Sequence, residues 1–296
     1  MLLKKLTGSK TIDSVTEINI MKRLVSVTLT VFFVSQIANA VQAQSIFEDK
    51  NLEAVVRKYV FAKRNNEEPL TEQDVENIST IEGKAKGVTS LKGMEKCRSL
   101  ALLDLEGNEI TDLAPIAGLK NIQSLNVANN KITDAGPVAE LVGLQYLQLS
   151  GNELTDLTPL KGLANLRSLY LSNNQLTDLT PIAELGKVWS LYVDGNKLTD
   201  LKPITKLTKI TSLDLRGNEV TDLSPIAGYT ELRYLLINNN KIADLNVLVE
   251  MAKKDSEGQK RFAPFWRIYT DGNPLSDGAK GQLDALKGLG ARINPK

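Results

Sequence analysis

The segment Leu166–Leu185 reads LRSLYLSNNQLTDLTPIAEL. Its apolar residues before Asn174 have the spacing of one face of a strand, and the residues between them face the opposite side. Its apolar residues after Asn174 fit an arc that returns to the same core. The spacing predicts these inward-facing residues: Leu166, Leu169, Leu171, Leu176, Leu179, Ile182 and Leu185. One such stretch cannot bury these side chains alone, so the segment requires similar stretches stacked against it.

The same pattern recurs along the chain with one asparagine in each copy. The interval is 22 residues, held six times in succession, at Asn108, Asn130, Asn152, Asn174, Asn196, Asn218 and Asn240. A further copy ends at Asn273, 33 residues after Asn240. An asparagine offers amide donors and a carbonyl acceptor to turn backbone groups that would otherwise be buried without partners. We therefore assign a structural role to all eight asparagines.

A proline follows the asparagine by seven residues in six copies. These are Pro115, Pro137, Pro159, Pro181, Pro203 and Pro225. Proline suits the first turn of a short helical segment, so we expect 3-10 segments on the side opposite the strands. A Thr-Asp pair recurs ahead of this turn, from Thr111 and Asp112 to Thr221 and Asp222. One carboxylate per copy is too few for a calcium site, and local capping explains the aspartates better.

The N-terminal end departs from the pattern. Ile81 and Lys86 fall in register one interval before Asn108, so the first copy keeps its strand and lacks its asparagine. Helical spacing predicts a helix over 51–63 with Tyr59 facing the core, and Thr71 and the following residues form a capping-box-like start for a second short helix. Cys97 occupies a frame held by leucine in later copies, which predicts a buried core residue and not a reactive thiol.

The C-terminal end contains an insertion before its last strand. The extra residues before Asn273 predict a helix from about Asn246 to Lys254, with Leu248 and Met251 facing inward. The last strand is restated by Phe265, Ile268 and Thr270. A final helix over about 276–287 is expected to close the stack.

The unit LxxLxLxxNxLTDLxPLxxL resembles the 22-residue class of leucine-rich repeat found in bacterial internalins, and is similar to that of the leucine-rich regulatory subunit of protein phosphatase 1. The resemblance implies an α/β solenoid with a parallel sheet on its concave face, short 3-10 segments on its convex face and helical caps. It also implies protein binding on the concave sheet. We interpret the chain as follows: an upstream extension over 1–20, a signal peptide over 21–43, an N-terminal helical cap over 44–77, about nine coils over 78–275 with a helical insertion near 246–264, and a C-terminal helical cap over 276–296.

Residues six, four and two positions before each asparagine are expected on the concave face. Five of the seven tyrosines fall there, and Tyr229 falls at a core-facing frame. Tyrosine combined with short polar residues is typical of adaptable recognition surfaces. The residues predicted to bind a ligand are Tyr146, Tyr170, Tyr192, Tyr234, Tyr269, Asp104, Glu106, Asp194, Asp214, Arg216 and Arg267.

The same concave residues are also compatible with sheet packing and with catalysis. Cross-strand packing favours aromatic residues on any face of a sheet, so the tyrosines do not by themselves require a ligand. Asp194 and Asp214 lie on neighbouring predicted strands, near enough for glycoside hydrolysis to be considered. An open sheet excludes little water, however, so we expect no catalytic residues and interpret the concave carboxylates as solvated surface charge.

The leader and the composition restrict the function further. Lys22 and Arg23 precede an apolar run and two small-residue cleavage signatures, which predicts secretory cleavage after Ala43. Residues 1–20 do not fit this leader, so either the start lies at Met21 or the leader is unusual. The chain contains no histidine, which excludes histidine-based catalysis and the commonest zinc sites. Without residues 1–43 it contains 31 basic and 33 acidic residues, which gives no footprint for nucleic acid.

These observations together predict a non-catalytic protein-binding module that is exported to the medium, the periplasm or the cell envelope. We expect a monomer with no cofactor, no metal, no nucleic-acid partner and no integral membrane segment after signal cleavage. A carbohydrate-binding envelope protein is the alternative, because tyrosine platforms serve glycans as well as proteins, and a hydrolase is the third candidate.

Overall fold

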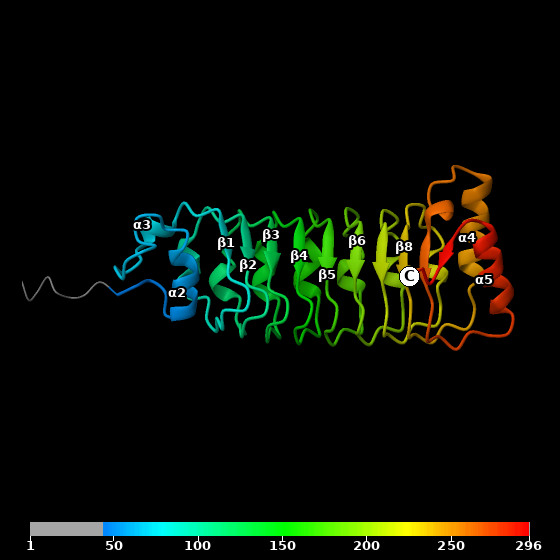
Figure 1. The fold of residues 1–296 in the computed structure, drawn as a ribbon, viewed down its shortest axis with the longest axis horizontal. Helices are drawn as coiled ribbons and strands as arrows, with labels where there is room; N and C mark the ends of the chain where they lie inside the picture. Colours follow the sequence, from blue (N-terminus) through cyan, green and yellow to red (C-terminus); the bar gives the residue numbers. More distant parts are fainter. Residues whose placement is uncertain (1–43, 296) are drawn as a thin grey trace, which may run out of the picture. The chain divides into compact units, whose positions relative to one another are not determined.

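The computed structural model describes residues 44–295 and contains one sheet of ten parallel strands. The strands lie in chain order, so each coil pairs with its sequence neighbours (Figure 1). They are β1 Thr80–Glu82, β2 Leu102–Asp104, β3 Ser124–Asn126, β4 Tyr146–Gln148, β5 Ser168–Tyr170, β6 Ser190–Tyr192, β7 Ser212–Asp214, β8 Tyr234–Leu236, β9 Arg267–Tyr269 and β10 Arg292–Ile293. This architecture confirms the predicted leucine-rich-repeat solenoid, and β10 lies beyond the last repeat, in the C-terminal segment.

Short 3-10 turns lie on the other side of the coils. They are η1 Met94–Lys96, η2 Ala114–Ile116, η3 Gly136–Glu140, η4 Thr158–Gly162, η5 Thr180–Ile182, η6 Lys202–Ile204, η7 Ser224–Ile226 and η8 Ala263–Phe265. Proline stands in the first turn of η2 to η7, as predicted. In each of these six coils the preceding aspartate accepts a hydrogen bond from the N–H two residues later, as Asp112 does from Ala114 at 2.7 Å, which confirms local capping.

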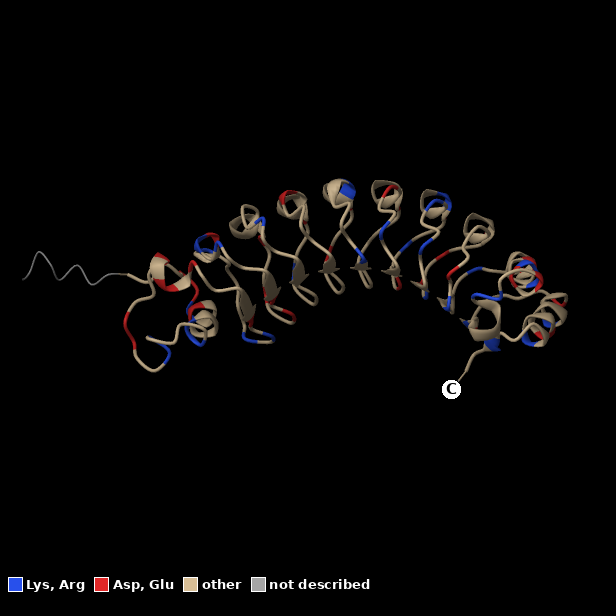
Figure 2. Ribbon diagram, turned by 90° about the horizontal axis from the view of Figure 1, so that it is seen from above, with Lys and Arg blue, Asp and Glu red and all other residues tan. Residues whose placement is uncertain are grey.

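The stack of coils curves, with the sheet on the inner side and the 3-10 turns on the outer side (Figure 2). Parallel strands are spaced about 4.8 Å apart, whereas the turns on the outer side are wider than strands. The inner side of the sheet is therefore a concave face, and the residues that point away from the core lie on it.

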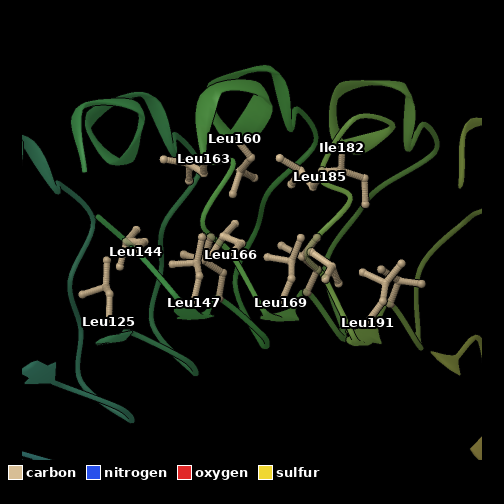
Figure 3. Close-up of a cluster of buried hydrophobic side chains, with 14 of the residues drawn as sticks. Leu125, Leu144, Leu147, Leu160, Leu163, Leu166, Leu169, Ile182, Leu185 and Leu191 are labelled. Carbon is tan, nitrogen blue, oxygen red and sulfur yellow. The ribbon is translucent and has the colours of Figure 1, made fainter. Parts of the chain in front are cut away.

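The core consists of leucine and isoleucine layers between the sheet and the outer turns (Figure 3). Leu169 of one coil lies between Leu147 and Leu191 of its neighbours, and all three are fully buried. Cys97 is buried in the same core, and burial raises the pKa of its thiol to about 12, as expected for a packing residue. The core side chains of each coil are thus shielded from solvent by the coils on both sides.

The repeat asparagines bond the turns of neighbouring coils to one another. The Asn174 amide donates to the carbonyls of Leu171, at 3.1 Å, and Leu149, at 3.0 Å. Its Oδ1 accepts from the N–H of Leu154 in the preceding coil at 3.0 Å. The equivalent bonds recur at the other repeat asparagines, which are buried except for the half-buried Asn273, so each asparagine joins its own turn to the coil before it.

The N-terminal cap contains α2 Lys50–Arg57 and α3 Glu72–Val75. The prediction of a helix over 51–63 is wrong at its C-terminal end, because α2 stops at Arg57 and turns follow. For the same reason Tyr59 is not a core residue. It is 37% exposed, and its hydroxyl accepts a 2.9 Å hydrogen bond from the N–H of Glu82 on the free edge of β1. The predicted capping box at Thr71 and Asp74 is confirmed.

The C-terminal cap contains α4 Asn246–Glu257, α5 Ala279–Gly288 and strand β10. Leu248 and Met251 of α4 are buried, as predicted. The prediction that Phe265 belongs to the last strand is wrong, because Phe265 lies in η8 with 64% of its surface exposed. Trp266 is fully buried in its place. The insertion ahead of this coil shifts the inward position by one residue, and Trp266 packs edge-on against Phe262 at 5.0 Å between ring centroids.

Candidate functional site

The concave face carries three rows of side chains, one residue of each row from every coil. We name them the first, second and third rows, for the residues six, four and two positions before the repeat asparagine. In the first two rows the strand register places equivalent residues side by side, as for Tyr170 and Tyr192 on β5 and β6. The inward leucine between the first and second rows fixes both of its neighbours to the opposite side of the strand.

Three of the predicted tyrosines form a continuous stack in the middle of this face, over β4, β5 and β6. The ring centroids of Tyr146 and Tyr170 are 5.4 Å apart, and those of Tyr170 and Tyr192 are 4.9 Å apart, in tilted arrangements. Burial raises the pKa of the Tyr146 and Tyr192 hydroxyls. Each ring keeps part of its surface open to solvent, so the stack is a fixed aromatic platform.

The other two predicted tyrosines are separate from this stack. Asp214 and Leu236 lie between Tyr192 and Tyr269 in the second row. Tyr234, in the first row, is 40% exposed and contacts Arg267, whose guanidinium carbon lies 5.3 Å from the ring centroid. The five tyrosines therefore form two groups.

Asp214 does not have the solvated position expected for a surface carboxylate. It is fully buried, and the guanidinium of Arg216 covers it with hydrogen bonds of 2.9 Å from Nε to Oδ1 and 2.6 Å from Nη2 to Oδ2. Burial raises the pKa of Asp214, while the Arg216 hydrogen bonds lower it and offset part of that effect. The fork of Arg216 closes this point of the face to water.

The Asp194 carboxylate is also engaged, because it accepts a short hydrogen bond from the Ser172 hydroxyl on the neighbouring coil. Glycoside hydrolysis requires two accessible carboxyl groups, one of which is protonated or nucleophilic. Asp214 is held in its ion pair beneath Arg216. The arrangement of Asp194 and Asp214 therefore does not suit that reaction.

At the N-terminal end of the face, carboxylates surround one lysine. Lys84 lies 3.2 Å from Asp104 and 2.9 Å from Glu106, and Asn126 donates to Glu106 at 3.1 Å. The pKa of Lys84 is raised by its hydrogen bonds to Glu106 and Asp104, and that of Glu106 is lowered by Lys84. A shallow pocket of about 230 Å³ opens here, lined by residues that include Glu82, Lys84, Asp104 and Tyr146.

Sequence reasoning missed three residues of this face. Glu82 and Lys84 occupy the second and third rows of the first coil, and the register of Lys86 would have found them. Trp189 lies seven positions before Asn196, just outside the three rows. It is 49% exposed, and its indole N–H donates to the first-row hydroxyl of Ser168 at 3.1 Å. The signal that could have found Trp189 is a large aromatic residue seven positions before the repeat asparagine, next to the first row.

Two kinds of feature are missing from the described part of the chain. Residues 44–295 contain no group of three histidine, cysteine or carboxylate side chains placed to hold a metal ion. No helix in the same range has the length and apolar character needed to cross a bilayer.

The comparisons with known proteins agree with this geometry. A family model described as leucine-rich repeats (2 copies) matches residues 98–140, 142–184 and 209–250. The solved structure of an internalin C2 from Listeria monocytogenes is 34% identical with a TM-score of 0.67, and the match covers 70% of this chain and 91% of that chain. The chain belongs to the internalin-like leucine-rich-repeat proteins. Such a fold supports a protein-interaction module, and its members are generally non-catalytic.

Two more distant structures complete the comparison for this internalin-like protein. A second internalin of Listeria monocytogenes, inlF, is 23% identical with a TM-score of 0.54, covers 86% of this chain and 94% of that chain, and supports the fold alone. A leucine-rich-repeat protein of Leptospira interrogans is 26% identical with a TM-score of 0.60, and covers 70% of this chain and 57% of that chain. No curated protein matches the sequence.

Proposed function

We propose that this internalin-like protein is an exported, monomeric, non-catalytic module that recognises a protein partner through its concave sheet. The observation that carries the proposal is the stack of Tyr146, Tyr170 and Tyr192 on that face. The stack supplies rigid aromatic area whose conformational entropy is already restricted before a partner binds.

Cross-strand packing explains why the rings contact one another, but it does not use their exposed surfaces. Aromatic pairs add about 0.5–1.5 kcal/mol beyond their buried area, which is a moderate stabilisation for a sheet with a continuous leucine core. The serine hydroxyls beside the stack, Ser168 and Ser190, and the exposed Trp189 add hydrogen-bonding and apolar area to the same surface. Aromatic residues of this kind dominate the binding energy of protein interfaces.

The proposal is tested by site-specific photocrosslinking in the native organism or its envelope fraction. A photoreactive amino acid at Tyr170 should capture a discrete protein partner, whereas the same group at Lys202 on the convex turn η6 should not. A Tyr170→Ala/Tyr192→Ala variant should lose that partner, and the control Phe61→Ala, which removes an aromatic side chain 79% exposed in the N-terminal cap, should retain it. Equal capture from both positions, or retention by the double variant, would refute the assigned face.

The carbohydrate alternative is separated by the same variants on a glycan array. Binding of a defined glycan that is lost with Tyr170→Ala/Tyr192→Ala, together with no protein crosslink, would replace the protein partner by a glycan.

Export is tested separately by N-terminal sequencing of the mature chain, which should begin at Gln44. An uncleaved chain would contradict the exported location.

A further inference from the structure

Resting on the proposed function, we infer that the C-terminal end of the concave sheet binds an acidic peptide segment of the partner. The basic end, as we name it, consists of Arg233, Arg267 and Arg292 with Tyr234. Arg267 and Arg292 stand in register on the paired strands β9 and β10. Like charges directly opposite each other destabilise a sheet, so the repulsion between these two guanidinium groups works against folding. An anion bound to both groups would reduce that repulsion.

The arginines of the basic end differ from others nearby. Arg216 is paired with Asp214, and Arg261 forms an ion pair with Glu231. Within residues 44–295, by contrast, the guanidinium groups of the basic end form no ion pair and donate to no protein acceptor. The nearby carboxylate of Asp271 is instead bonded to the Asn294 amide at 2.6 Å.

Local contacts fix the position of the basic end. The guanidinium of Arg267 lies over the ring of Tyr234, with 5.3 Å from its carbon to the ring centroid. The Arg267 N–H donates to the carbonyl of Arg233 at 2.8 Å, so the backbone of Arg233, whose side chain is exposed, lies beside the start of β9. A guanidinium oriented by an aromatic ring presents a planar fork of donors that matches a carboxylate.

Charge along the face favours a peptide over a uniformly charged polyanion. The opposite end of the sheet carries Glu82, Asp104 and Glu106 around Lys84, so a sulfated glycan laid along the sheet would be repelled there. A peptide that is acidic at one end only meets attraction at the basic end without that repulsion.

The experiment measures fluorescence anisotropy of a labelled oligo-glutamate peptide titrated with the purified full chain at low ionic strength. The wild type should bind oligo-glutamate and not oligo-lysine. An Arg267→Gln/Arg292→Gln variant should weaken binding by about tenfold or more, which is the expected size for lost charge-assisted hydrogen bonds. The matched control Lys161→Gln/Lys202→Gln removes the same charge from the convex turns η4 and η6 and should leave the affinity within about twofold.

Two further variants keep the test decisive if the glutamine variant does not fold. Arg267→Lys/Arg292→Lys retains the charge and loses the fork, so it should bind oligo-glutamate less tightly than the wild type. Arg267→Glu/Arg292→Glu should bind oligo-lysine in preference to oligo-glutamate. Thermal midpoints measured by circular dichroism identify any variant that is unfolded.

The inference is overturned if the glutamine variant binds oligo-glutamate like the wild type, or if the convex control loses as much affinity. Tighter binding of a heparin fragment than of oligo-glutamate, lost in the same variant, would replace the peptide by a sulfated glycan. A failed crosslink at Tyr170 would refute the proposed function, while the oligo-glutamate measurement could still be interpreted. An intact Tyr170 crosslink together with no oligo-glutamate binding at the basic end would refute this inference and leave the proposed function standing.

Discussion

Central coils and the N-terminal cap protect their backbone groups in different ways. In a central coil, Asn174 bonds its own turn to the preceding coil, and the same contact is repeated in the next coil by Asn196. The first coil has Lys86 at that frame and no preceding coil to pair with. Its cap uses Asp49, which caps α2 through the N–H groups of Asn51 and Leu52 and also accepts from Thr89 N–H at 2.6 Å.

This difference shows what repetition achieves and where it stops. A repeated contact is reinforced on both sides, so its loss affects two neighbouring interfaces. The cap depends on individual contacts from α2 to the loop after β1, such as the Asn51 amide donating to the Gly87 carbonyl at 2.9 Å. Each of the following substitutions tests this contrast, in order of decreasing effect.

The largest effect is expected for Leu169→Ala in the central sheet. The side chain is fully buried between equivalent leucines of two coils, so its removal should lower the free energy of unfolding by about 2–5 kcal/mol. Urea denaturation followed by circular dichroism measures this. A loss below about 1 kcal/mol would show that the layers can collapse into the space, and that neighbouring coils do not hold one another rigidly.

A smaller effect is expected for Asn174→Ala. The substitution leaves the buried Leu154 N–H and Leu149 carbonyl without their partner and should cost about 1–3 kcal/mol. The control Asn165→Ala removes an exposed asparagine of the same coil, whose side chain donates to the Val142 carbonyl and accepts from the Lys187 ammonium at the surface, and should cost less. Equal losses in the same denaturation experiment would contradict a special role for the buried asparagine.

In the N-terminal cap, Asp49→Ala should cost about 1 kcal/mol, the usual value for the loss of a helix N-cap. Hydrogen exchange should increase in α2 and the 86–92 loop while the central strands stay protected, because the contact is not propagated by repetition. Increased exchange throughout the central coils would mean that the cap and the stack unfold together.

The stabilisation by Asp49 should also depend on pH. Burial raises the pKa of Asp49, but hydrogen bonds from the Thr89 N–H, the Leu52 N–H, the Thr89 hydroxyl and the Ser90 N–H lower it by more, and the net pKa is below its usual value. A lowered folded-state pKa stabilises the fold above the unfolded pKa of about 3.9, and this stabilisation is lost as pH falls below that value. The difference in unfolding free energy between wild type and Asp49→Ala should therefore narrow below about pH 4. A constant difference would contradict the ionised cap.

The smallest effect is expected for Lys131→Gln. Lys131 forms a 2.8 Å ion pair with Glu109 of the neighbouring coil, but both side chains are 56% exposed. Solvent screens such a pair, so the unfolding free energy should change by about 0–1 kcal/mol. A larger change would indicate that charge ladders, and not only leucine layers and asparagines, hold adjacent coils together.

The sequence by itself determined the period of the coil, the sheet on one side, the proline-led turns on the other and the role of the asparagines. Each of these depends on spacing within one copy of the repeat, and repetition makes the signal unambiguous. It also placed Tyr146, Tyr170 and Tyr192 on one face, because alternation along a strand fixes the side from which a residue projects.

Only the tertiary structure decided which of these residues meet. It stacked three tyrosines and placed Arg267 over Tyr234, buried Asp214 beneath Arg216, exchanged Phe265 for Trp266 in the core and added β10 beyond the last repeat. These outcomes depend on neighbouring coils competing for the same space and on how the irregular ends close the stack. The spacing of a single copy contains no information about either, because both are set by side chains that come from different coils.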